Sequence, residues 1–231
     1  MVAANLGPGV NPITFSDDGR LFVAQCFFGD GLYEVDPLGE KEPRSIRDDL
    51  GPGCGLNGMD WGPDNRLYGP RWFDNEVISV DVDTGESRVE VSGLQVPAAV
   101  KFNSAGELHI LDTAAGTVLR RNTDGSVEVV ARLETGLDNF AFDNEDNLFV
   151  SSYADGSIVR VSGDSAEEVL PGGISHPGGL TVLDETLVVA DIQSLRAVDI
   201  ATRNDVWVLR NIFRSAPLGT TTSVSLSLIH I

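Results

Sequence analysis

The chain has 231 residues, which is long enough for one large domain with a substantial core. Its 35 Asp and Glu residues outnumber its 16 Lys and Arg residues, and the formal net charge is −19. A field of this sign repels phosphate backbones, so the composition excludes a nucleic-acid-binding role. The carboxylates are either solvated loop residues or the lining of a mouth that attracts cations.

The N-terminal segment Met1–Asn5 has neither the charged region nor the apolar region of a secretory signal. No apolar stretch approaches the roughly 18 residues that span a membrane. If Met1 is the true start, these features predict a cytoplasmic protein that does not interact with membranes.

A repeat runs along the whole chain. An aromatic or β-branched anchor recurs with spacings of 46, 41, 40 and 40 residues, at Phe15, Trp61, Phe102, Phe142 and Val182. A leucine follows each anchor, and a turn rich in Asp, Asn and Gly separates the two in the first four repeats. Self-similarity at this period is the signature of β-propeller blades.

Each repeat is expected to form four short strands, because alternating apolar residues are bounded by turns that contain Asp and Gly. In chain order, the first repeat predicts strands at 13–15, 20–25, 32–35 and 44–46, and the second at 58–61, 66–68, 77–81 and 87–91. The third repeat predicts 99–102, 107–111, 117–121 and 126–131, and the fourth 140–142, 147–151, 157–161 and 167–170. The fifth predicts 180–182, 186–190, 195–199 and 206–209. The fold class is therefore all-β: an incomplete propeller of four-stranded blades, expected to be six-bladed when complete.

A sixth repeat begins but does not continue. Pro217 lies 40 residues after Pro177, in step with the prolines that precede the first strand of other repeats. After Val224 the pattern fails, and residues 225–231 read either as translated adapter sequence or as a natural apolar strand. We expect one propeller domain over 1–224 and a non-native tail over 225–231. An open arc of blades would expose two sheet edges.

The chain has two cysteines, Cys26 after a strand-like run and Cys54 in a loop rich in Gly and Pro. They could pair, but spacing alone does not fix the geometry that a disulfide needs. The sequence predicts two free thiols that are buried at least in part.

In a propeller, the residue just before the first strand of each blade faces the axial channel. The slot four residues before each anchor holds Asn11, Asn57, Ala98, Asp138 and Gly178. Three of these five side chains carry the kind of oxygen that binds a hard divalent cation such as Ca²⁺. Alternatively, Asn and Asp stand there because they favour turns and strand entries.

The second repeat resembles a known family. The segment Leu56–Trp61 (LNGMDW), followed by Asp64–Tyr68 and Ile78–Gly85, is similar to the central blade of the regucalcin (senescence marker protein), gluconolactonase and luciferin-regenerating family. The resemblance implies a six-bladed, NHL-like propeller and, in many members, a lactonase that uses one divalent cation in its channel. It gives Asn57 the role of a metal ligand and places Asn11 near the substrate.

The chain departs from this family in the next blade, where Pro97-Ala98-Ala99 replaces the usual Pro-Asp-Gly. The metal ligand and base of that motif are therefore missing. Asp138 stands in the same slot one blade later and is our candidate for both roles. Asn11 and Asn57 would be the other ligands of a Ca²⁺ or Zn²⁺ ion. The alternative role of Asp138 is to cap the turn that precedes it.

Asn139 and His176 are the candidates for contact with the substrate. Asn139 follows Asp138, and His176 lies two residues before its slot, in Ser-His-Pro-Gly-Gly. A channel histidine is similar to the arrangement in virginiamycin B lyase, a propeller lyase that uses His and Mg²⁺, whereas the alternative is an ordinary loop residue. Trp72 and Phe73 either line the mouth or cover a blade edge.

Three functions are consistent with this sequence. The first is a metal-dependent hydrolase in which a cation polarises a lactone or ester carbonyl and Asp138 activates water. The second is a non-enzymatic NHL-type propeller that binds a protein or glycan, which Ala98 and Gly178 favour because they leave two slots without donors. The third is a lyase with His176 as the base. The expected partner is a small molecule in the axial channel, and the complete protein is expected to be a monomer.

Overall fold

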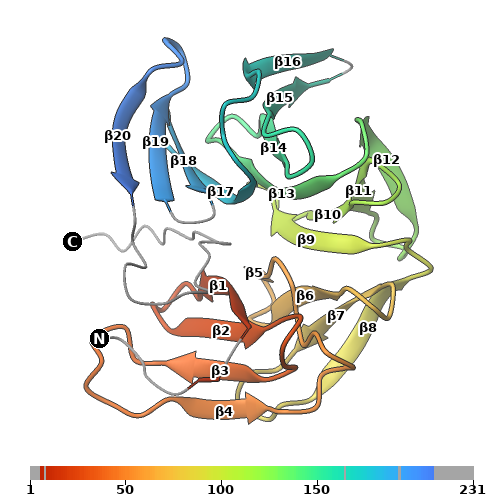
Figure 1. Ribbon diagram of the computed structural model, residues 1–231. Helices are drawn as coiled ribbons and strands as arrows, with labels where there is room; N and C mark the ends of the chain where they lie inside the picture. The colour runs from red at the N-terminus through yellow and green to blue at the C-terminus, as the bar shows by residue number, and fades with distance from the viewer. Residues whose placement is uncertain (1–5, 8, 164, 192–193, 211–231) are drawn as a thin grey trace.

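The computed structural model describes residues 6–7, 9–163, 165–191 and 194–210, which form an all-β propeller (Figure 1). Their strands make five four-stranded sheets, and each sheet is one blade in which consecutive strands are neighbours. All of these strand pairs are antiparallel. Among the described residues, no helix is long and apolar enough to cross a membrane.

Each blade begins with the strand nearest the centre of the arc and ends with the outermost strand (Figure 1). The first blade contains β1 (Val10–Phe15), β2 (Leu21–Gln25), β3 (Leu32–Val35) and β4 (Arg44–Arg47). The second contains β5 (Asp60–Trp61), β6 (Leu67–Arg71), β7 (Glu76–Val80) and β8 (Ser87–Ser92). The third contains β9 (Pro97–Phe102), β10 (Leu108–Asp112), β11 (Thr117–Arg121) and β12 (Val127–Arg132). The fourth contains β13 (Leu137–Phe142), β14 (Leu148–Ser152), β15 (Ile158–Ser162) and β16 (Ser165–Leu170). The fifth contains β17 (Pro177–Leu183), β18 (Thr186–Asp191), β19 (Ser194–Asp199) and β20 (Asp205–Arg210).

The hairpin between the first two strands of a blade needs a residue with a left-handed backbone. The angle φ is positive at Gly19 (83°), Asn65 (60°), Gly106 (74°) and Asp146 (59°), each four residues after an anchor. Gly has no Cβ to clash there, and Asn and Asp tolerate this conformation better than most side chains. The recurring turn chemistry therefore sets the strand boundaries in the first four repeats.

The expected strands are confirmed, each with ends within three residues of the prediction. A systematic difference lies in the first strands, because β1, β9, β13 and β17 begin two or three residues earlier than the sequence predicts. In each of these four strands the pairing register shifts near the start of the strand. Alternation of apolar residues does not reveal such a β-bulge, since the extra residue interrupts the alternation.

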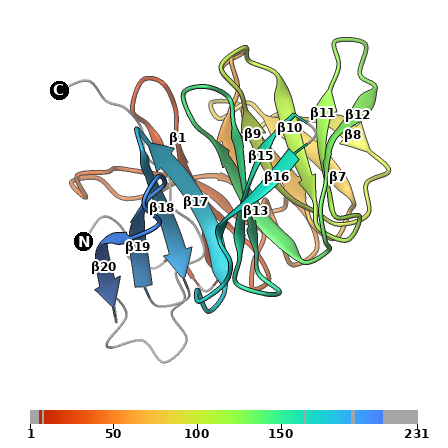
Figure 2. The ribbon, with the colours of Figure 1, turned by 90° about the horizontal axis from the view of Figure 1, so that it is seen from above.

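The blades pack in chain order around a common centre (Figures 1 and 2). Strand β1 contacts β5, strands β5 and β6 contact β9, β9 contacts β13, and β13 contacts β17. No comparable contact joins β17 to β1 among the described residues, so these five blades form an open arc. The expected start of a sixth repeat at 217–224 and the tail at 225–231 lie outside the described residues.

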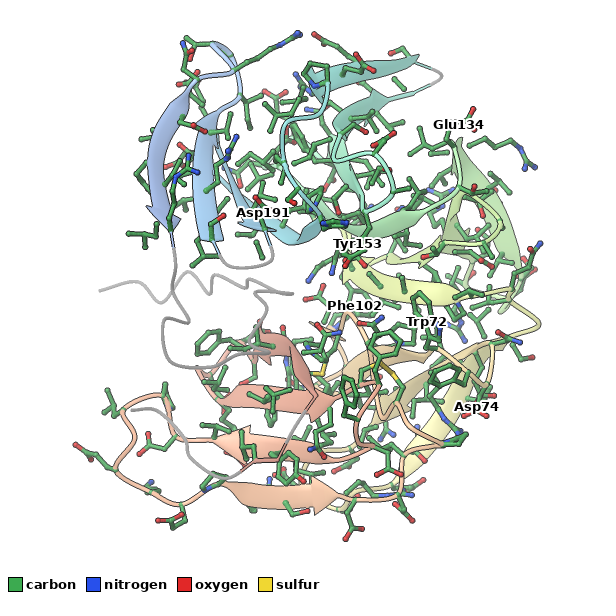
Figure 3. All side chains as sticks on the ribbon, viewed as in Figure 1. Trp72, Asp74, Phe102, Glu134, Tyr153 and Asp191 are labelled. Carbon is green, nitrogen blue, oxygen red and sulfur yellow. A yellow bond between two sulfur atoms is a disulfide. The ribbon has the colours of Figure 1, made fainter. Side chains whose placement is uncertain are left out.

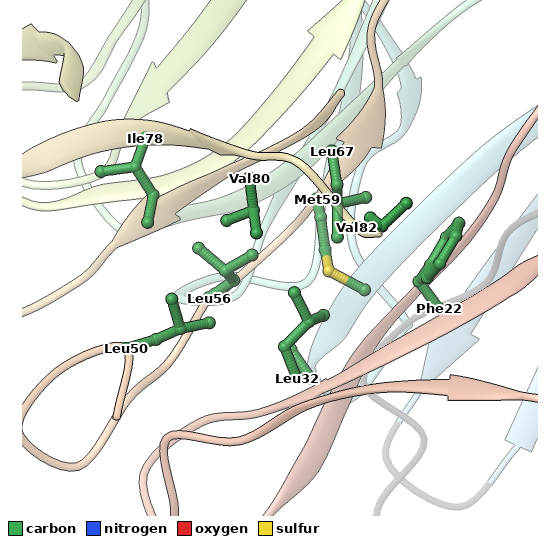
Figure 4. Packing of buried hydrophobic residues seen from close by; sticks show 10 residues of the cluster. Phe22, Leu32, Leu50, Leu56, Met59, Leu67, Ile78, Val80 and Val82 are labelled. Atoms are coloured by element: carbon green, nitrogen blue, oxygen red, sulfur yellow. The ribbon is translucent and has the colours of Figure 1, made fainter. Parts of the chain in front are cut away.

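Apolar side chains fill the space between neighbouring blades. Phe22 and Leu32 of the first blade pack against Leu56, Met59 and Leu67 of the second (Figure 4). None of these five residues is more than 1% exposed. Burial of a side chain of this size stabilises a fold by about 1.5–3 kcal/mol. Packing between blades is therefore a main source of stability, and it fixes how the blade entries meet at the centre.

Cys26 and Cys54 form a disulfide, so the expectation of two free thiols is wrong. Their backbones also pair as an isolated bridge, and the Gly55 N–H donates to the Gln25 carbonyl oxygen over 2.9 Å. The loop after β4 returns to the end of β2 before the second blade begins, which brings together residues that are 28 positions apart.

Candidate functional site

The slot residues lie at one end of the propeller axis, where the first strands are irregular. In β1, β9, β13 and β17 the register shifts beside the slot. Asp138 is the extra residue between Leu137 and Asn139, which pair with consecutive residues of β14. A bulge turns a side chain out of the ordinary alternation of its strand. In the second blade β5 begins late, so Asn57 lies in the loop ahead of it.

Two of the predicted ligands, Asn11 and Asn57, are in direct contact. Asn11 Nδ2 donates a hydrogen bond to Asn57 Oδ1 over 3.2 Å, across the boundary between the first two blades. Asn57 Oδ1 also accepts from the Gly58 N–H over 3.0 Å. The Asn57 N–H donates to the Pro70 carbonyl oxygen over 2.9 Å, which ties Asn57 to β6. Asn57 is buried, so its side chain is held in one orientation.

The slot of the third blade is apolar. Ala98 is buried in a cluster with Ala99, Leu111 and Phe140, and Trp72 of the second blade packs against the same cluster. The departure from the Pro-Asp-Gly motif therefore changes packing as well as charge. A methyl group stands in this slot, so any carboxylate in a slot position must come from another blade.

Asp138 is the only one of the five slot residues that has a carboxylate side chain. It is half-buried, and no hydrogen bond or ion pair joins its side chain to another described residue. Burial without a partner penalises the charged form, and it raises the pKa of Asp138 from its ordinary 3.8 to about 7. A carboxyl group that titrates near neutrality can both accept and release a proton at that pH.

The Asn139 side chain is hydrogen-bonded to the backbone of its own blade. Its Oδ1 accepts from the Phe140 N–H over 2.8 Å. The Ser151 hydroxyl lies 3.1 Å from the nitrogen and the oxygen of the Asn139 backbone and 2.9 Å from the Gly178 carbonyl oxygen. Ser151 thus ties the fourth blade to the entry of the fifth. A substrate contact through Asn139 stays a prediction.

His176 lies at the entry of the fifth blade, beside Tyr153 of the fourth. The two ring centroids are 4.6 Å apart. The His176 N–H donates to Asp191 Oδ1 over 3.1 Å, and Nδ1 is buried with no hydrogen-bond partner in the described part of the chain. Figure 3 shows Tyr153 and Asp191 near the centre of the arc and Asp74 farther out. His176 directly precedes β17, so it lies at the same end of the propeller axis as the slot residues.

The donor set fits a hard cation better than zinc. Asn11, Asn57 and Asp138 offer oxygen atoms, which Ca²⁺ and Mg²⁺ prefer, whereas zinc sites are usually built with His and Cys. No group of three or more His, Cys, Asp or Glu side chains that could hold a metal occurs among the described residues. A cation here would rest on one carboxylate and two amides, and it would have to displace a hydrogen bond that Asn57 Oδ1 accepts from Asn11 or Gly58. We therefore expect weak binding.

Four aromatic residues follow the ends of β2 and β6: Phe27, Phe28, Trp72 and Phe73, which we call the aromatic patch. Phe27 packs edge to face against Trp72 and Phe73, with centroid distances of 5.5 and 6.2 Å. The sequence alone places Trp72 and Phe73 at a mouth or a blade edge but gives no role to the other pair. Their position in the repeat could have linked the two pairs, because Phe27 and Phe28 follow β2 as Trp72 and Phe73 follow β6.

Two carboxylates near the blade entries serve the backbone. Buried Asp112, at the end of β10, accepts from the N–H groups of Gln95 and Val96 over 2.7 and 3.0 Å. Asp191, at the end of β18, accepts from the His176 N–H. Each fastens the segment that enters its blade to the end of the second strand, so neither is a candidate ligand.

Two clefts lie at the opposite end of the blades, among the turns between first and second strands and between third and fourth strands. One, of about 550 Å³, is lined by Asp143, Glu145, Arg160, Asp184 and Arg203, among others. The other, of about 670 Å³, is lined by Asp17, Arg20, Asp64, Asp83 and Arg88, among others. Several of these charges are paired, as Arg20 is with Glu34 and Asp83. These clefts are grooves between neighbouring blades and do not contain the slot residues.

The fold and these side chains define a class of protein: an all-β propeller with polar groups gathered at one end of its axis. No protein-family model matches the sequence. A comparison with curated proteins finds no match either.

Solved structures of other propellers are similar to the chain in fold. A gluconolactonase from Xanthomonas campestris is 14% identical, with 93% of this chain and 79% of that chain covered and a TM-score of 0.74. Virginiamycin B lyase from Staphylococcus aureus is 14% identical, with 96% and 76% covered and a TM-score of 0.70. A chain of a nidogen/laminin complex is 14% identical, with 94% and 84% covered and a TM-score of 0.77. Two are enzymes and one belongs to a protein complex, so this likeness concerns the fold alone.

Proposed function

We propose that this protein is a hydrolase that opens a small lactone or ester at the slot end of its axial channel. The observation that carries the proposal is Asp138, a half-buried carboxyl group on a β-bulge whose pKa is raised to about 7. The contact between Asn11 and Asn57 at the same end of the propeller axis supports it. The fold shared with the Xanthomonas gluconolactonase is consistent with it.

Asp138 acts as a general base in this proposal. Its carboxylate accepts a proton from water while the water oxygen attacks the carbonyl carbon of the lactone. The ring C–O bond then breaks, and the departing oxygen takes the proton back from Asp138. The product is a hydroxy acid, and the carboxylate is regenerated. Asn11 and Asn57 orient the carbonyl oxygen, and a divalent cation held by these three residues would supply Lewis-acid polarisation.

The decisive experiment compares Asp138→Asn with Asp184→Asn. Asp184 is an exposed turn residue with φ of 51°, a conformation that Asn also tolerates. Hydrolysis of δ-gluconolactone and γ-butyrolactone would be followed by acid release, with Ca²⁺ and with chelator. We expect kcat/KM to fall about 10²–10⁴-fold in the Asp138 variant and to stay at the wild-type value in the Asp184 variant. Equal loss in both, or none in either, would contradict the proposal.

The role of Asn57 is tested by metal binding. Asn57→Ala removes one of three oxygen donors, so the Kd for Ca²⁺ measured by calorimetry should rise roughly tenfold or more. The Asp184→Asn variant is again the control. An unchanged Kd in Asn57→Ala would remove Asn57 from the metal site, and the general-base role of Asp138 would then have to stand without it.

A lyase is the second candidate, because His176 Nδ1 is buried without a partner among the described residues. As the base of an elimination, His176 would remove a proton from carbon and leave a double bond in the product. His176→Ala should then abolish the appearance of the alkene absorbance, while Asp138→Asn should leave most of it. If neither acid release nor alkene is detected with any substrate, a non-enzymatic binding propeller is the better account.

A further inference from the structure

We propose that the aromatic patch binds an alkyl or aryl group of the substrate while the substrate carbonyl reaches Asn57 and Asp138. This inference rests on the proposed hydrolase function. It narrows the substrate class to lactones or esters that carry an apolar substituent, in place of small polar sugar lactones.

The patch exposes to solvent aromatic side chains of the kind that usually lie in a protein core. Phe27, Phe28 and Phe73 are 46%, 74% and 53% exposed. In the described part of the chain, the other strongly exposed aromatic side chains are Tyr153 and Trp207, which belong to the fourth and fifth blades. Contiguous exposed apolar surface of this kind marks a site for a ligand or a partner.

The fold holds the patch in place at an energetic cost. Phe27 has φ of 68°, a left-handed conformation that is strained for a bulky side chain. Such strain persists only where the surrounding structure enforces it. Here the preceding residue, Cys26, is bonded to Cys54, and the Phe27 ring lies against Trp72 and Phe73. The strained backbone keeps an aromatic ring on the surface, which points to binding.

The patch is continuous with the candidate site. Trp72 packs against the cluster that contains Ala98, the apolar slot residue of the third blade. Pro70, two residues before Trp72, accepts the hydrogen bond from the Asn57 N–H. Cys54, which anchors the other half of the patch, lies three residues before Asn57. Both segments that carry the patch are therefore tied to Asn57, one by a backbone hydrogen bond and one through the chain.

The chemistry of the patch selects an apolar group over a charged one. Arg71 precedes Trp72, and its guanidinium is paired with Asp74 and, over 2.8 Å, with Glu76. This charge is already neutralised within the fold. A sugar ring also needs hydrogen-bond partners around it, whereas three of the four patch residues are phenylalanines. An alkyl chain or aryl ring needs only apolar contact.

The test uses lactones with one ring and different tails: γ-butyrolactone, γ-hexalactone, γ-nonalactone and γ-decalactone. A fully buried methylene strengthens binding about fourfold, and one lying on an open surface roughly twofold. We therefore expect kcat/KM of the wild-type chain to rise with each added methylene. In the Asp138→Asn variant, which binds without turnover, the Kd measured by calorimetry should fall along the same series.

Phe28→Ser and Phe73→Ser should flatten this dependence on tail length, because both side chains are exposed and their loss removes contact area for the tail. Leu38→Ser is the matched control, since Leu38 is 77% exposed in the β3–β4 turn, away from the patch. Circular dichroism and thermal unfolding check that the variants fold. Phe73→Leu, which keeps an apolar side chain, should retain most of the dependence.

The outcomes separate the patch from the hydrolase. The same tail dependence in wild type and both serine variants would overturn the patch proposal and leave the hydrolase standing. Tighter binding along the series without hydrolysis, lost in the serine variants, would support the patch and contradict the hydrolase. Binding of δ-gluconolactone that is stronger than that of γ-decalactone and depends on Phe73 would also overturn the proposal, in favour of sugar stacking.

Discussion

The two sides of the candidate site are held by different forces. On the side of the first two blades, Cys26 is bonded to Cys54 and Asn11 is hydrogen-bonded to Asn57. On the side of the fourth and fifth blades, the contacts are hydrogen bonds through the Ser151 hydroxyl and packing between rings. The first side carries exposed aromatic surface, and the second carries Asp138.

This difference matches what each side would do. A surface that recognises an apolar group gains from rigidity, because an ordered patch loses little freedom when it binds. A carboxyl group that gains and loses a proton needs a neighbourhood in which both charge states are tolerated. A dense network of hydrogen bonds to Asp138 would fix its ionised form and return its pKa to the ordinary range.

The largest expected effect on stability comes from removing the disulfide on the side of the first two blades. Cys26→Ser with Cys54→Ser opens a loop between residues 28 positions apart, and it should lower the free energy of unfolding by about 2–4 kcal/mol. Urea unfolding with and without dithiothreitol measures this. The reductant should destabilise the wild-type chain and leave the double variant unchanged. If dithiothreitol does not change the free energy of unfolding of the wild-type chain, the disulfide does not stabilise the fold.

Gly58→Ala tests the close packing of the same side against the third blade. A Cβ on Gly58 would lie 2.6 Å from the Ala99 Cβ and 2.9 Å from the Ala98 carbonyl oxygen, so we expect a loss of about 1–3 kcal/mol. The double variant Gly58→Ala with Ala99→Gly should recover part of it in thermal unfolding. Gly58 does not have a positive φ, so backbone strain is not expected to add to its loss. No recovery in the double variant would mean that packing against the Ala99 methyl group is not the cause.

The smallest effect is expected on the side of Asp138, and it depends on pH. The raised pKa means that the unfolded chain ionises above about pH 4 while the folded chain holds its proton to about 7. Stability is therefore lost as the pH rises from 4 to 7. A shift of about three pKa units corresponds to about 4 kcal/mol for a fully buried group, but Asp138 is only half-buried and solvent screens its charge. Asp138→Asn removes this penalty, so in chelator it should be more stable than the wild type by on the order of 1–2 kcal/mol at pH 8. At pH 4 the two should be alike, and a constant difference between pH 4 and 8 would contradict the raised pKa.

Much of the fold could be predicted because its signals are local. The anchors at Phe15, Trp61, Phe102 and Phe142 recur with turns of fixed chemistry, and each turn needs a left-handed residue at one position. Strand alternation and turn chemistry depend on neighbours within a few residues. The strand pattern is therefore readable without knowing how the blades meet.

The candidate site could be predicted only in outline. The repeat places Asn11 and Asn57 in equivalent slots, and the structure joins them by a hydrogen bond across 46 residues. The repeat does not show that Asp138 stands on a bulge. It also gives no sign that Phe27 packs against Trp72, since that contact arises when two blade ends come side by side.

By itself, the sequence determined the repeat, the all-β class and the end of the blades at which the slot residues gather. Those features follow from backbone conformation and side-chain alternation, which are short-range properties of the chain. Only the tertiary structure decided the Cys26–Cys54 bond, the desolvation of Asp138 and the assembly of the aromatic patch. Each of these depends on how one blade packs against the next, and so on contacts between residues far apart in the sequence.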